Sequence, residues 1–277
     1  MLKQLLKYEF KATGRTYGGL YLALVALAVL SGFSLRSSSK DNFASLLLFA
    51  YMVVAVAVAV VSVMTIVTRF TRNLLGREGY LMHTLPVSNA QLILAKLIPS
   101  ILWVLCSIVV VLLSFVLFSL FGTLNSAAVS EFFHAFSRYG SEIGKLLSSV
   151  IKGYGVTLVL MVLEWLASLT CSILCIYTAC MIGHWCKKYF VAVSIAAFVV
   201  LNVLQNQLLN LLPYNTTNTG LDLVFSTSAG DGSIVYTVTG NKTYLWAVLA
   251  TLAADLVLCA VYFTATSWLM KNKLDLE

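Results

Sequence analysis

Residues 42–68 read NFASLLLFAYMVVAVAVAVVSVMTIVT and contain no Asp, Glu, Lys, Arg or His. A helix of about 20 apolar residues crosses the hydrocarbon core of a bilayer, so this stretch is long enough to span a membrane. Its many valines favour a strand by propensity, but an open strand in lipid leaves its backbone polar groups without hydrogen-bond partners. We therefore interpret the segment as a transmembrane helix.

The rest of the chain has the same apolar character. Of the 277 residues, 60% are hydrophobic and 10% are charged, and the mean hydropathy is +0.92. Soluble domains carry about a quarter charged residues and disordered chains lack apolar surface, so both classes are excluded. The sequence predicts an all-α integral membrane protein with six transmembrane helices. The expected spans are residues 17–35, 43–68, 97–121, 154–183, 189–212 and 243–269.

Basic residues indicate the orientation of these spans. Six crossings place both termini on one side, and that side carries 12 of the 18 Lys and Arg residues. Because cytoplasmic segments carry an excess of Lys and Arg, we expect both termini to be cytoplasmic. The net charge of +7 then reports orientation in a membrane, and we expect no nucleic-acid partner.

Two segments outside the spans have helical amphipathic spacing. Residues 1–16 place leucines on one side and lysines on the other, which predicts a helix in the plane of the cytoplasmic leaflet of the lipid bilayer. Residues 126–152 repeat apolar side chains at steps of three and four, which predicts a second amphipathic helix on the outer side. The outside loop 213–242 alternates over 233–239, which indicates a short strand pairing with 221–225.

The cytoplasmic loop 71–95 is the most informative segment, and its residues 78–88 read EGYLMHTLPVS. Residues 79–84 can form a short helix, which Pro86 ends because it removes a donor and disfavours helix at Leu85. Ser88 is a suitable N-cap for the following helix. The apolar Tyr80, Leu81 and Leu85 are typical of a segment that docks into the groove of another protein.

This stretch, with Lys96 after it, resembles the cytoplasmic loop of ABC-2 type ABC-transporter permeases from Gram-positive bacteria. The opening LLKYEFK at residues 5–11 is similar to the N-terminal interfacial helix of the same family, and the six-span plan fits it. The resemblance implies a permease subunit of an exporter in the bacterial plasma membrane. Two such subunits, identical or different, would enclose the substrate pathway. Two separate ATP-binding subunits would carry ATP and Mg²⁺.

In that family the short element of the loop is a coupling helix, which docks into the ATPase. The resemblance implies a polar contact for Glu78 and for His83 and apolar anchors at Tyr80, Leu81 and Leu85. Thr84 and Pro86 would shape the turn, and Gly79 lies within the helix. An ordinary loop histidine is as good an interpretation of His83.

No sequence feature predicts enzymatic activity in this chain. The nucleotide-binding pattern GxxxxGK[ST] is absent, and the nearest stretch, residues 140–146, is one residue short and lacks the hydroxyl. None of the three histidines begins the HExxH pattern of zinc peptidases. Cys171 and Cys175 lie four positions apart, and we interpret them as packing residues rather than metal ligands.

Glu164 and Asp255 are the carboxylates inside predicted spans. Each either lines a pathway for a cation or proton or makes a hydrogen bond between helices, and the second role is the commoner one. They also support an alternative function, an ATP-independent secondary carrier or channel. The sequence does not identify the substrate.

Overall fold

The computed structural model describes most of the chain. The described residues are 2–36, 42–75, 89–123, 126–185, 189–210, 222–227, 234–239 and 242–272. The segment 76–88, with the predicted coupling helix, lies outside the described residues.

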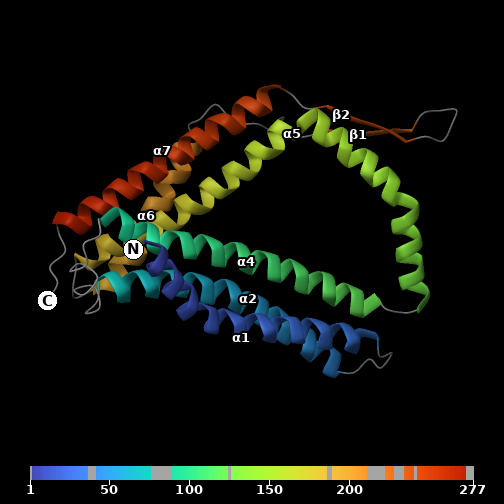
Figure 1. Ribbon diagram of the computed structural model, residues 1–277, viewed down its shortest axis with the longest axis horizontal. Coiled ribbons are helices and arrows are strands. Elements are labelled where there is room, and N and C mark those ends of the chain that lie inside the picture. The colour runs from blue at the N-terminus through green and yellow to red at the C-terminus, as the bar shows by residue number, and fades with distance from the viewer. Residues whose placement is uncertain are drawn as a thin grey trace. The chain divides into compact units, whose positions relative to one another are not determined.

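The described chain is helical apart from one hairpin (Figure 1). Its elements are α1 (Leu2–Arg36), α2 (Asn42–Phe70), the π-helical turn η1 (Thr71–Leu75), α4 (Asn89–Thr123), α5 (Ser126–His184), α6 (Phe190–Asn210), β1 (Asp222–Thr227), β2 (Ile234–Thr239) and α7 (Lys242–Asn272).

Six helical segments in the described residues are long and apolar enough to cross a membrane. They are Leu6–Ser34, Phe43–Phe70, Asn89–Gly122, Gly155–His184, Phe190–Asn210 and Leu245–Lys271. Each overlaps one of the predicted spans, which confirms their number and the class of a multi-pass membrane protein. The side that the termini face stays a prediction.

Two helices are longer than the sequence predicts. α1 begins at Leu2 and runs without a break through the predicted interfacial helix 1–16 into the predicted span 17–35. In the same way α5, a helix of 59 residues, contains both the predicted amphipathic helix 126–152 and the predicted span 154–183. The predicted boundaries coincide with charged residues such as Lys152, but lysine and arginine are good helix formers, so α5 continues through this position. The two amphipathic segments are therefore continuous with their neighbouring spans, not separate helices.

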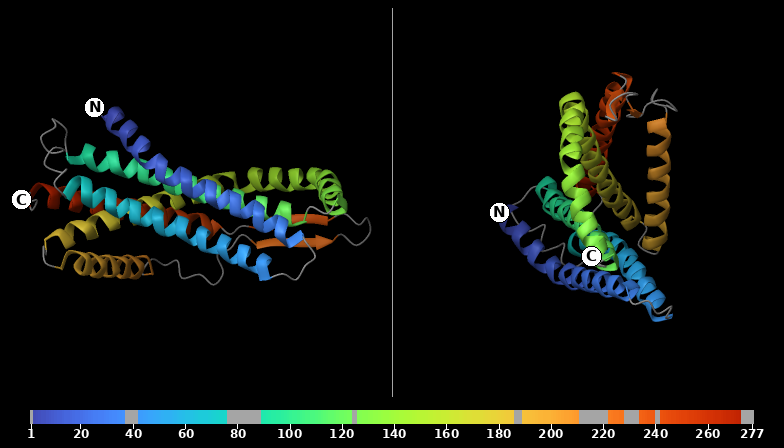
Figure 2. Two further views of the ribbon diagram at one scale, coloured as in Figure 1. Left: turned by 90° about the horizontal axis from the view of Figure 1, so that it is seen from below. Right: turned by 90° about the vertical axis from the view of Figure 1, so that its right-hand side faces the viewer.

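The first of two compact units contains α1, α2 and α4, which run side by side (Figures 1 and 2). It comprises residues 1–133 and 266–277. Leu24 and Ala28 of α1 pack against Tyr51 and Val58 of α2, and apolar side chains of α4 lie against this core. The bundle is thus held in its middle by interlocking apolar contacts.

α1 and α4 approach each other closely at Gly32. A Cβ atom at this position would lie 2.8 Å from the Cβ of Phe121 and 2.9 Å from the carbonyl oxygen of Phe118. Both atoms belong to the backbone or the stem of a side chain, so neither moves easily. Glycine lets the two helices reach this distance.

The second unit, residues 134–265, contains most of α5, α6, the hairpin and most of α7. α7 packs along α5, as two contacts show. The thiol of Cys259 in α7 lies 3.6 Å from the carbonyl oxygen of Ala167 in α5, and the hydroxyl of Thr178 in α5 lies 3.5 Å from the carbonyl oxygen of Tyr262 in α7. α6 contacts α5 through Asn202, whose Nδ2 donates to the sulfur of Cys175 at 3.8 Å.

The hairpin confirms the strand pairing that the alternating sequence predicts. β1 and β2 are antiparallel, with Asp222 opposite Thr239 and Thr227 opposite Ile234.

Candidate functional site

An ion cluster joins the first helix to both flanks of the loop 71–95. The carboxylate of Glu9 in α1 accepts a hydrogen bond from Arg69 Nη1 at 3.2 Å on Oε2 and another from Lys96 Nζ on Oε1. Arg69 is the next-to-last residue of α2, and Lys96 lies in the second turn of α4. One carboxylate therefore bridges three helices.

The cluster is largely shielded from solvent. The side chain of Lys96 is 5% exposed and that of Glu9 is 12% exposed, whereas Arg69 is 28% exposed. A buried ammonium group is tolerated when a carboxylate pairs with it, and removing one partner of such a pair costs about 3–5 kcal/mol. Lys96 thus depends on Glu9 more than Arg69 does.

The spacing of α1 brings Glu9 to this position. Glu9, Thr13 and Tyr17 follow at steps of four, so they share one helix face. Thr13 is buried and its hydroxyl donates to the Glu9 carbonyl oxygen at 2.7 Å, while the Tyr17 ring stacks on Trp103 with centroids 4.6 Å apart. This face packs against α4 between Lys96 and Trp103.

A second polar layer lies deeper along the same three helices. The Tyr21 hydroxyl is 2.7 Å from the hydroxyl oxygen of Ser107, which is 3.3 Å from that of Ser62. Further along, the hydroxyls of Tyr51 and Ser114 are 3.1 Å apart. Hydrogen bonds at several levels therefore fix α1, α2 and α4 relative to one another.

The residues predicted to form the coupling helix are not among those that the structure describes. They are Glu78, Gly79, Tyr80, Leu81, His83, Thr84, Leu85 and Pro86. The structure describes the helix ends on either side of them, and those ends meet at Glu9.

The structure brings the two predicted intramembrane carboxylates together. Glu164 of α5 and Asp255 of α7 are close enough to interact electrostatically. Asp255 is 4% exposed, and its buried Oδ1 has no hydrogen-bond partner among the described residues. The thiol of Cys259, one helical turn further along α7, neighbours that of Cys171.

The described residues contain no group of three or more His, Cys, Asp and Glu side chains arranged to hold a metal ion. Cys171 and Cys175 are both buried in α5, as packing residues are.

The ion cluster was not predicted from the sequence. Glu9 and Lys96 both belong to the segments that carry the resemblance, and Arg69 and Lys96 are among the basic residues that indicate orientation, but neither pattern pairs them. One signal could have identified them: Glu9 is the sole Asp or Glu in the sequences of α1, α2, η1 and α4. A single acidic residue among so many basic ones is a natural ion-pair partner.

Comparison with known proteins identifies no relative, since no family model, no curated protein and no solved structure matches the chain.

Proposed function

We propose that this chain is the permease subunit of an ATP-binding cassette exporter, driven by separate ATPase subunits. The observation that carries the proposal is the Glu9 cluster, which ties α1 to both flanks of the loop that would dock on the ATPase. A docking loop transmits force only when its ends are held firmly by the transmembrane helices. The six spans and the resemblance of residues 78–88 support the same function.

The proposed mechanism follows from this arrangement. ATP binding closes the pair of ATPase subunits and moves the two coupling helices toward each other. The loop pulls on the end of α2 and the start of α4, and Glu9 makes α1 move with them. The hydrogen-bonded layers deeper in the bundle pass the displacement along the spans, which open the pathway to the outside.

Copurification tests the proposal. The tagged full chain is isolated from its native host, and its associated ATP-binding subunits are quantified beside those of a Tyr80→Ala/Leu85→Ala variant. We expect a stoichiometric ATPase with the wild-type chain and its loss with the variant. Met82→Ala/Val87→Ala is the control, because it also truncates two apolar side chains of the same loop, neither of them a predicted anchor. A wild-type chain that purifies without an ATPase contradicts the proposal.

A second candidate function is an ATP-independent cation or proton carrier, favoured by Asp255 alone. A buried carboxylate oxygen with no partner among the described residues is costly in a membrane, and such groups often mark ion pathways. This candidate predicts transport by the purified chain in vesicles without ATP, and its loss in Asp255→Asn.

A further inference from the structure

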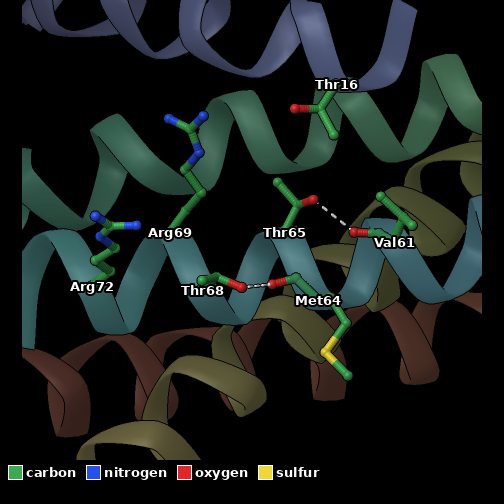
Figure 3. Close-up of a pocket in the computed structure, with 7 residues that line it drawn as sticks. All are labelled: Thr16, Val61, Met64, Thr65, Thr68, Arg69 and Arg72. Carbon is green, nitrogen blue, oxygen red and sulfur yellow. Dashed lines mark hydrogen bonds between the residues drawn. The ribbon is translucent and has the colours of Figure 1, made fainter. Parts of the chain in front are cut away.

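A small cavity lies beside the ion cluster, and all of its lining residues belong to α1, α2 and α4. Glu9, Arg69 and Lys96 are part of its wall, so the cavity is complete within the first unit. A wider groove shares Thr65 and Arg69 with it, and Figure 3 shows these two side chains on the same side of α2. The volume of the cavity is about 20 Å³, and one water molecule needs about 10–15 Å³ of such space. The cavity therefore has room for a single water molecule.

Trp103 brings a hydrogen-bond donor to the cavity wall. Its Nε1 atom is buried and has no hydrogen-bond partner among the described residues. The indole ring cannot easily turn to find one, because it stacks on Tyr17 with centroids 4.6 Å apart and an interplanar angle of 5°. The Cζ2–Cη2 edge of the ring faces Gly14 of α1, where a Cβ atom would lie 3.8 Å away. Since a buried N–H group without a partner is costly, a ligand that accepts a hydrogen bond is favoured here.

The hydroxyl groups of the wall offer the opposite half of a hydrogen bond. The Thr13 hydroxyl donates to the Glu9 carbonyl oxygen at 2.7 Å. The Thr65 hydroxyl donates to the Val61 carbonyl oxygen at 2.7 Å, along one of the dashed lines in Figure 3. Because a hydroxyl group has one hydrogen, both oxygen atoms can only accept from a ligand, and the carboxylate of Glu9 is an acceptor too. The ligand therefore has to accept from Trp103 and donate to oxygen atoms, which water does.

Pro99 gives a second reason for a water molecule at this place. It lines the cavity from inside α4. Proline has no N–H group, so the carbonyl oxygen of Ala95 lacks the donor that position 99 supplies in a regular helix. Ordered water molecules are one of the means by which transmembrane helices satisfy backbone groups that proline frees.

We propose that the cavity binds one ordered water molecule, which accepts from Trp103 Nε1 and donates to oxygen atoms of Thr13, Thr65 or Glu9. A neutral ligand suits this wall better than an ion does, because a carboxylate there lies next to an ammonium and a guanidinium group. The water connects the aromatic stack between α1 and α4 to the ion cluster, and it hydrates charges that the helices shield. This inference does not rest on the proposed function.

A crystal structure of the full chain, at a resolution that shows ordered water, tests the proposal. We expect an electron-density peak in the cavity about 2.7–3.2 Å from Trp103 Nε1 and at a similar distance from at least one oxygen atom of the wall. A cavity without density overturns the site. A peak with the scattering of chloride and only N–H groups around it, or density continuous with a lipid chain, overturns the assignment to water.

Replacement of Trp103 by benzothienylalanine tests the donor, because sulfur takes the place of the N–H group while the bicyclic ring can still stack on Tyr17. We expect the occupancy of the peak to fall at least about twofold, since the water loses one of roughly three hydrogen bonds. The same replacement at Trp246, which is 70% exposed and does not line the cavity, is the matched control and should leave the occupancy unchanged.

Equal occupancy in the two variants overturns Trp103 as the partner of the water. A melting curve of the Trp103 variant shows whether a folded chain is compared, and the density in the wild-type chain decides the site independently of the variant.

Discussion

Glu9 in the first unit and Asp255 in the second are both carboxylates shielded from solvent, but they differ in the partners that surround them. In the first unit Glu9 accepts from two cations on two other helices. In the second unit Asp255 has an electrostatic neighbour of the same sign, Glu164, and an Oδ1 with no hydrogen-bond partner among the described residues. The same functional group is therefore paired with cations in one unit, whereas in the other unit it has a buried oxygen without a hydrogen-bond partner among the described residues.

This difference matters for assigning roles in membrane proteins. A charge inside a membrane-spanning helix is commonly taken as functional. By that criterion both carboxylates would qualify, because Glu9 lies in the apolar segment Leu6–Ser34 and Asp255 in Leu245–Lys271. The partners distinguish them, because a satisfied charge contributes to the assembly of helices whereas an unsatisfied one raises the energy of the protein in its resting form.

The strongest test of the comparison is Glu9→Gln. The amide removes the negative charge that faces the buried Lys96, so we expect the free energy of unfolding to fall by about 3–5 kcal/mol. Unfolding by SDS in mixed micelles measures it. Lys11→Gln should change it by less than about 0.5 kcal/mol. Glu9→Gln/Lys96→Met should recover most of the loss, and an equally unstable double variant contradicts the ion-pair explanation.

Gly32→Ala tests whether the close packing of α1 against α4, as well as the ion cluster, stabilises the first unit. The added methyl would meet Phe121 and Phe118, so we expect a loss of about 1–3 kcal/mol. Gly19 in the same helix has open space around its Cα, and Gly19→Ala should be neutral or stabilise by up to about 1 kcal/mol. The same unfolding titration compares the two, and equal effects would show that Gly32 is no contact point.

Asp255→Asn should have the opposite sign to Glu9→Gln. Insertion of a charged Asp at the centre of a span costs about 2.5–3.5 kcal/mol, and the amide avoids part of that cost. We expect a gain in unfolding free energy of about 1–2 kcal/mol. A loss as large as that of Glu9→Gln would mean that Asp255 is also a structural joint, and the contrast between the two units would fail.

Tyr21→Phe gives the smallest expected effect and calibrates the others. It removes the hydroxyl from the layer with Ser107 and Ser62, and hydrogen bonds between membrane helices contribute about 0.6 kcal/mol on average. Hence the unfolding midpoint should shift only slightly. A loss above about 2 kcal/mol would indicate that the polar layers, rather than Glu9, dominate the stability of the bundle.

Much of the fold could be predicted from the sequence because apolar length is a strong signal. The run 42–68 leaves no alternative to a span, and the alternation over 233–239 indicated the strand that the structure shows as β2. Helix continuity was missed for a physical reason. The charge of Lys152 suggested an end, but it does not disturb helical hydrogen bonds, and α5 continues through it.

The candidate site was harder to predict because it depends on contacts between distant residues. Glu9 and Lys96 are 87 positions apart, and no local pattern reveals which cation a lone carboxylate will meet. Asp255 and Glu164 were recognised individually, since each interrupts an apolar run. They come close only because α7 packs along α5, and the periodicity of apolar residues does not reveal which helices pack together.

The separation of Glu9 from its partners also sets an order of events during synthesis. Arg69 follows Glu9 by 60 residues and Lys96 follows it by 87. At about 5–20 residues per second, Glu9 waits about 3–12 s for the first and about 4–17 s for the second. During this time α1 is in the membrane without either cation and is held there by its apolar length alone. The bundle closes when α4 emerges, so a ribosome that pauses between α2 and α4 would leave a nascent helix pair lacking its third member.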